Sequence, residues 1–140
     1  MSDPSQKKPI LAKAEPTSSS LSDAFELQSL AAQAGFDWPD ISGVVNKINE
    51  ELSEVLAEIN IENNEVRLKD EIGDLLFTCI NLARHLNIDP EQALQSGNKK
   101  FFDRFTRLEE IVDAEGKNIS DHSLVQLEQL WQRVKQEHKN

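Results

Sequence analysis

The 140-residue sequence has one cysteine, no tyrosine, only five glycines and five prolines, and no long apolar run. The single thiol, Cys79, excludes an internal disulfide and favours a reducing, cytoplasmic location. No segment approaches the roughly 18 to 20 apolar residues that a membrane span needs, and the amino-terminal residues lack the apolar block of a signal peptide. Few turn-forming residues beside many Leu, Glu, Gln and Ala predict an all-α protein.

Basic residues are also scarce, because 15 Lys and Arg face 25 Asp and Glu, for a formal net charge of -10. A duplex nucleic-acid binder needs a broad basic face to displace counterions, so we expect no duplex nucleic-acid partner. The same acidity disfavours docking on an anionic membrane surface. The chain therefore has an excess of carboxylates, and some of them are candidates for a catalytic or metal-binding role.

The chain is long enough for one domain with a modest core. Residues 1–20 hold three of the five prolines and a run of three serines, so we expect a disordered leader there and a domain at 21–140. Gly35 is placed to end a first helix, whereas Asp40 and Asp89 are placed to begin later ones. Apolar periodicity predicts five helices in all, over about residues 21–34, 41–59, 65–86, 90–114 and 123–137.

Two of these predicted helices carry an acidic pair, spaced i, i+3, at the border of an apolar stripe. At about 100° per residue, Glu51 and Glu54 lie on one border of the stripe in the second helix. Glu71 and Asp74 lie at the same relative angle in the third helix. If the turn between the helices centres near residues 61–63, all four carboxylates converge at one level of an antiparallel pair.

Carboxylates that converge without partners repel one another, so a cation is expected among them. A ligand set of oxygen atoms, with no His or Cys, favours Mg²⁺ or Mn²⁺. A di-iron bundle is disfavoured because no His stands at the i+3 position. The competing interpretation is a solvated acidic flank, which is the usual role of a single pair, and the pattern alone leaves both open.

The two apolar stripes are predicted to form the core. In the second helix the stripe contains Ile48, Leu52, Val55, Leu56 and Ile59, and in the third it contains Leu68, Ile72, Leu75, Cys79, Leu82 and Leu86. Trp131 of the last helix is also expected in a core, with stacking on a nucleobase as its alternative role.

Cations recur at helical spacing near the acidic pairs and on the fourth helix. Lys47 and Arg67 each stand one turn before an acidic pair, where they can neutralise it or reach a phosphate. Lys100, Arg104 and Arg107 form one stripe, for which pairing with local carboxylates is the plain interpretation.

The segments EELSE (residues 50–54) and EIGD (71–74) resemble the EExxE…ExxD signature of the MazG family of all-α nucleoside triphosphate pyrophosphohydrolases. The blocks GFDW, NLARHLNIDPEQAL, NKKFFDRF and LWQRVK are similar to the carboxy-terminal catalytic half of that family. The resemblance covers about residues 22–137.

This resemblance implies an antiparallel helical bundle of about five helices that a homodimer completes. It also implies Mg²⁺-dependent hydrolysis of a nucleoside triphosphate to the monophosphate and pyrophosphate, in nucleotide pool sanitation or control of stress nucleotides. The metal ligands carried over by position are Glu51, Glu54, Glu71 and Asp74, with Glu54 also as the group that accepts the proton of the attacking water. The substrate contacts carried over are Lys47, Arg67, Lys100, Arg104, Trp131 and Lys135.

Two other functions stay open at this point. One is a narrower pyrophosphatase that acts on a particular deoxynucleoside triphosphate. The other is a non-catalytic helical dimerisation or regulatory protein, in which the acidic cluster binds nothing.

Overall fold

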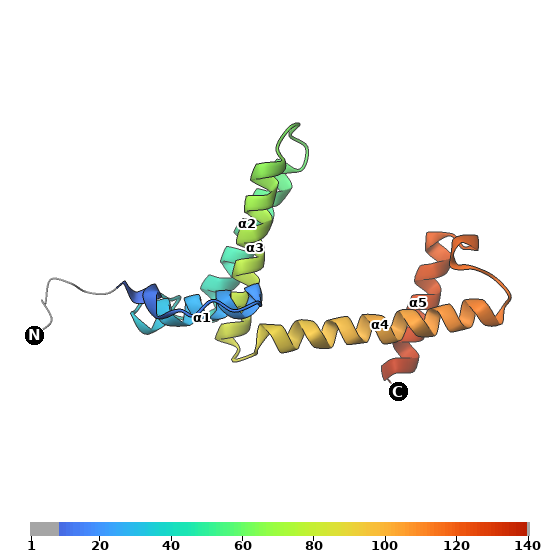
Figure 1. Ribbon diagram of the computed structural model, residues 1–140. Coiled ribbons are helices and arrows are strands. Elements are labelled where there is room, and N and C mark those ends of the chain that lie inside the picture. Colours follow the sequence, from blue (N-terminus) through green and yellow to red (C-terminus); the bar gives the residue numbers. More distant parts are fainter. Residues whose placement is uncertain (1–8, 140) are drawn as a thin grey trace, which may run out of the picture. The chain divides into compact units, whose positions relative to one another are not determined.

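The computed structural model describes residues 9–139, which form α-helices and short 3-10 helices and no β-strand (Figure 1). The elements are η1 (Ile10–Lys13), α1 (Ser20–Gln33), α2 (Ile41–Glu58), α3 (Glu65–His85), α4 (Pro90–Ala114), η2 (Ile119–Asp121) and α5 (Leu124–Lys139). The prediction of an all-α fold with five helices is confirmed. Each helix begins and ends within two residues of its predicted bounds.

The helix ends follow the signals read from the sequence. Gly35 ends α1 with a φ of 96°, a left-handed conformation that glycine adopts without strain. The side chain of Asp40 accepts a hydrogen bond from the Ser42 amide at 2.9 Å and so caps α2. Before α4, the side chain of Asp89 accepts from the Glu91 amide at 2.9 Å. These caps satisfy backbone groups that a helix end leaves without partners.

The chain divides into two compact units, of which the first ends at Glu91 and the second begins at Gln92. In the first unit, α2 and α3 lie side by side as an antiparallel hairpin, and α1 packs against α3 (Figure 1). The side-chain amide of the buried Gln28 on α1 donates to the Phe77 carbonyl of α3 at 2.8 Å.

The 3-10 helix η1 packs against α1, so part of the predicted leader has regular structure. Residues 1–8 of that leader lie outside the described residues. The boundary between a leader and a domain at residue 21 therefore stays a prediction.

The second unit has its own small core between α4 and α5. Its buried members are Leu108, Ile111, Val112 and Val134. Trp131 is half-buried and packs against this cluster together with Ile119, Leu127 and Leu130, so its expected place in a core is confirmed. None of the helices within residues 9–139 combines the length with the apolar character that crossing a membrane requires.

The predicted core of the α2–α3 hairpin is wrong for about half of its residues. Leu52, Leu56, Ile59, Ile72 and Leu86 are between 44% and 59% exposed, and Cys79 is exposed as well. The remaining members of the two stripes, Ile48, Val55, Leu68, Leu75 and Leu82, are half-buried. Two helices side by side bury only the facing parts of their stripes, and the periodicity does not say how many further helices cover the rest.

Candidate metal centre

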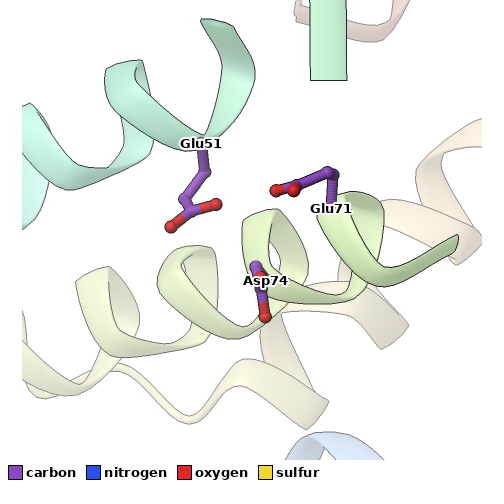
Figure 2. A group of neighbouring side chains, drawn as sticks. All are labelled: Glu51, Glu71 and Asp74. Carbon is purple, nitrogen blue, oxygen red and sulfur yellow. The ribbon is translucent and has the colours of Figure 1, made fainter. Parts of the chain in front are cut away.

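Three carboxylates meet between the two helices of the hairpin. Glu51 comes from α2, whereas Glu71 and Asp74 come from α3 (Figure 2). One oxygen of each lies within 4.8 Å of the others. Figure 2 shows the carboxylates of Glu51 and Glu71 directed toward each other across the space between the helices. The predicted convergence of acidic residues at one level of the hairpin is thus present for these three.

The burial of Glu51 and Glu71 distinguishes these two carboxylates from the acidic surface, whereas Asp74 is exposed. Glu51 is only 5% exposed, and Glu71 is half-buried. One buried oxygen of each, Oε2 in both cases, has no hydrogen-bond partner in the protein. A buried carboxylate oxygen without a donor is costly, and a cation relieves that cost. The residues therefore fit a hard divalent ion, since every available ligand atom is a carboxylate oxygen.

Glu54 lies at the edge of the cluster and is exposed. It is not among the three carboxylates that meet within 4.8 Å. Its pKa is nevertheless raised, first by the contact with the Glu71 carboxyl, with the contact to Glu51 acting in the opposite direction. A raised carboxyl pKa is the signature of crowded anions, so Glu54 belongs to the same electrostatic site.

Lys47 is the cation that lies closest to the cluster along α2. Its Nζ atom lies 3.2 Å from Oε1 of Glu51 and 3.2 Å from Oε1 of Glu50. These contacts raise the pKa of Lys47, with the hydrogen bond to Glu50 as the largest cause. Arg67 lies on α3, one turn before Glu71, and is exposed. Both cations belong to the first unit, and their contact with a phosphate stays a prediction.

The other predicted substrate contacts belong to the second unit. Lys100 is exposed, and Lys135 is half-buried. Arg104 donates through Nε to Nδ1 of His138 at 3.3 Å. The ring of Trp131 lies 5.5 Å from the ring of Phe101, centroid to centroid. Four of the predicted substrate contacts therefore belong to the second unit, whereas the carboxylate cluster belongs to the first.

Arg107, the third member of the basic stripe, pairs with carboxylates as the plain interpretation expects. Its Nε atom lies 3.1 Å from Glu137, and its Nη1 atom lies 3.3 Å from Glu110. These contacts raise its pKa, with the hydrogen bond to Glu137 as the largest cause.

The sequence pattern missed an ion-pair group between the α1–α2 connector and the end of α3. The guanidinium of Arg84 donates to Oδ1 of Asp37 at 2.6 Å, and Nε2 of His85 lies 2.9 Å from the same oxygen. The pKa of Asp37 is lowered to about 2, first by its hydrogen bond with Arg84. Because that folded-state pKa lies below the ordinary value, the stabilising ion pair between Asp37 and Arg84 is complete above about pH 4 and is lost only as the pH falls through about 2.

Comparisons with known proteins point to one family. Residues 40–107 match the MazG nucleotide pyrophosphohydrolase domain. Over 130 residues, 93% of this chain, the sequence is 37% identical to the nucleoside triphosphate pyrophosphohydrolase/pyrophosphatase MazG of Thermotoga maritima. Over 115 residues, 81% of this chain, it is 42% identical to the nucleoside triphosphate pyrophosphohydrolase of Escherichia coli K12.

The matches cover only part of these relatives. The chain spans 49% of the Thermotoga protein and 44% of the Escherichia protein, so it corresponds to about half of each. A shorter match, 42% identical over 73 residues, covers 52% of this chain and 15% of the uncharacterized protein YabN of Bacillus subtilis. The matched domain contains all three carboxylates that meet between α2 and α3.

Proposed function

We propose that this chain is a member of the MazG family and that it hydrolyses a nucleoside triphosphate to the monophosphate and pyrophosphate. The observation that carries the proposal is the carboxylate cluster of the buried Glu51, the half-buried Glu71 and the exposed Asp74. Its unpartnered oxygens suit a divalent cation, and a triphosphate is a substrate that such a cation binds.

We take the ion to be Mg²⁺, with Mn²⁺ as the alternative. Glu51, Glu71 and Asp74 would hold the ion, and Glu54, whose pKa is raised by the crowded carboxylates, would be the fourth ligand. A bound divalent ion supplies Lewis-acid polarisation of the α-phosphate and lowers the pKa of the attacking water. Glu54 is our candidate for the group that accepts the proton of that water, because it is exposed and lies outside the three carboxylates that meet between the helices.

Cations of the chain would hold the remaining phosphate charge. Lys47 now pairs with Glu50 and Glu51, and a bound ion would free its ammonium to meet a phosphate oxygen. Arg67 lies one turn from Glu71 and is exposed, so its guanidinium can take up a phosphate in a bidentate manner. Lys100, Arg104, Trp131 and Lys135 are proposed as further substrate contacts on the strength of the family resemblance.

The direct test is pyrophosphate release from a panel of ribo- and deoxyribonucleoside triphosphates, measured with Mg²⁺ and with EDTA. We expect Mg²⁺-dependent release from several nucleotides. Cleavage of a single deoxynucleoside triphosphate would support the narrower pyrophosphatase instead. If no nucleotide released pyrophosphate, the result would support the non-catalytic alternative. The cellular role that we propose is nucleotide sanitation or stress-nucleotide control in the cytoplasm, carried out by a catalytic domain at residues 21–140.

We also propose that the protein works as a homodimer. The α2–α3 hairpin exposes a set of large apolar side chains on both of its helices: Val45, Leu52, Leu56, Ile59, Ile72, Leu76 and Phe77. Clustered apolar exposure of this kind is uncommon on a monomer and typical of an association surface. A second copy of the hairpin would complete the helical bundle that the family resemblance implies.

The replacement Leu56→Asp is expected to shift the protein from a dimer toward a monomer. Leu56 is 59% exposed, so the change costs the isolated chain little, whereas a carboxylate in an apolar interface is costly. Light scattering after size exclusion measures the mass, for which the dimer predicts twice the 15.8 kDa of the chain. The matched control is Leu124→Asp, because Leu124 is 72% exposed on α5 and outside the hairpin. A monomeric wild type would contradict the proposal.

A further inference from the structure

The indole of Trp38 lies on the first turn of α2 in a place that only glycine at position 43 permits. A Cβ atom on Gly43 would lie 2.8 Å from Cε3 and 2.9 Å from Cδ2 of the indole, closer than such atoms approach. Glycine inside a helix costs about 0.5–1 kcal/mol relative to alanine. The first turn of α2 beside Gly43, which we call the seat of the indole, therefore combines a close contact with the ring and a locally weaker helix.

The seat does not bury the ring. Trp38 remains 45% exposed although it is among the largest apolar side chains of the molecule. Tryptophan is highly buried on average although rarely buried completely, so an indole that is nearly half exposed has much of its surface free for contacts. The ring therefore rests on the helix and keeps part of its aromatic surface available.

The connector that carries the ring is held in place by charge. Oδ1 of Asp37 accepts hydrogen bonds from the Trp38 amide at 2.8 Å and from the Arg84 guanidinium at 2.6 Å. His85 contacts the same oxygen. The pKa of Asp37 near 2 keeps this carboxylate charged at neutral pH. The backbone of Trp38 is thus tied through Asp37 to the end of α3, which fixes the point from which the indole reaches Gly43.

The seat lies on the same side of α2 as the candidate metal centre. Gly43, Lys47 and Glu51 follow one another at intervals of four residues, so they lie within about 80° around the helix axis. The axial distance from Gly43 to Glu51 is about 12 Å at 1.5 Å per residue. Along this side of α2, the aromatic surface of Trp38 is followed by the ammonium of Lys47 and then by the carboxylate cluster that contains Glu51. A nucleoside triphosphate presents a base, then anionic phosphates, over a comparable length.

We propose that the indole of Trp38 is a stacking platform for the nucleobase of the substrate, with Asp37 as the positioning residue that holds it there. This assignment rests on the proposed function and adds how the base is recognised. Aromatic stacking tolerates every base, because each base has a π-face. The platform therefore gives affinity for nucleotides as a class with little choice among them.

The test compares ATP with ribose 5′-triphosphate, which has the same phosphates and sugar but no base. Both substrates are measured with saturating Mg²⁺ for the wild type and for Trp38→Ala, Trp38→Leu and Trp38→Phe. For Ala and Leu we expect the KM for ATP to rise about tenfold or more, with kcat changed less and the KM for ribose 5′-triphosphate unchanged. Phe keeps an aromatic face and should retain most of the affinity for ATP.

Two further variants separate stacking from a structural role. Phe36→Ala removes an aromatic ring two residues away that is 84% exposed and has no seat, and it should leave both substrates unaffected. Asp37→Asn should raise the KM for ATP but not for ribose 5′-triphosphate, because the ring loses its position and the phosphate contacts stay.

The outcomes distinguish this inference from the function on which it rests. A wild type that releases pyrophosphate from no triphosphate of the full panel would overturn the proposed function, and the platform with it. A wild type that cleaves other nucleotides but not ATP would overturn the platform, because stacking on an indole tolerates every base. An active wild type whose preference for ATP survives Trp38→Leu would overturn the platform alone. Equal losses on both substrates in Trp38→Leu, which fills the seat with an apolar side chain, would likewise assign Trp38 a structural role.

Discussion

The replacement Glu71→Gln is expected to lower kcat/KM for Mg²⁺-dependent pyrophosphate release by about 10²–10³-fold. The side chain keeps its size and one carbonyl oxygen but loses the charge that neutralises the ion. Glu71 faces Glu51 across the hairpin, and a buried oxygen of each lacks a protein donor (Figure 2). The loss should appear in kcat/KM even at high Mg²⁺, because the ion would be held off its position.

The neighbouring Asp70→Asn is the matched control. Asp70 precedes Glu71 on α3 and is exposed. Its replacement by Asn removes the same single negative charge from the chain as Glu71→Gln does. We expect it to change kcat/KM by less than about threefold, since an exposed charge acts weakly through solvent. Similar losses in both variants would show that general electrostatics, and not a metal ligand, explains the effect.

The replacement Glu51→Gln is expected to have opposite effects on stability in EDTA and in Mg²⁺. In EDTA the variant should unfold at a higher temperature than the wild type, because it removes a charge that is 5% exposed and only partly compensated by Lys47. The wild type should gain about 2.7 kcal/mol at a Mg²⁺ concentration one hundred times its Kd, which is roughly 5–12 °C in Tm. The variant should lose most of that gain.

Thermal unfolding followed by circular dichroism measures both effects. Glu50→Gln is the control, because Glu50 is adjacent, exposed and paired with the same lysine, and it should keep the full response to Mg²⁺. If Glu51→Gln were destabilised in EDTA and still responded to Mg²⁺ like the wild type, the cluster would be a structural feature without a metal.

Local signals were sufficient for the secondary structure and for most of the carboxylate cluster. Gly35, Asp40 and Asp89 act within a few residues of their own positions, so the helix ends could be read from the sequence. The convergence of Glu51 with Glu71 could also be predicted, because a short turn fixes the register of an antiparallel pair. The angles selected Glu54 as a fourth member, whereas the structure brings three carboxylates together and leaves Glu54 at the edge.

Contacts between distant segments could not be predicted in this way. Asp37 meets Arg84 and His85 across nearly fifty residues, and no periodicity links a connector to the end of another helix. The sequence shows that a helix has an apolar stripe, but not what covers it, which is why Leu56 and Ile72 are exposed where a core was expected. The close approach of Trp38 to Gly43 is a third case, because a glycine inside a helix can have several causes.

The most direct test of the central claim is hydrolysis of ATP by the wild type with Mg²⁺ in water enriched in ¹⁸O. The products are separated, and mass spectrometry identifies which of them carries the label. The account predicts AMP and pyrophosphate in equal amounts, with the ¹⁸O label in AMP, since water attacks the α-phosphate. Release of ADP and phosphate, or label in the pyrophosphate, would contradict it, as would an equal rate in EDTA.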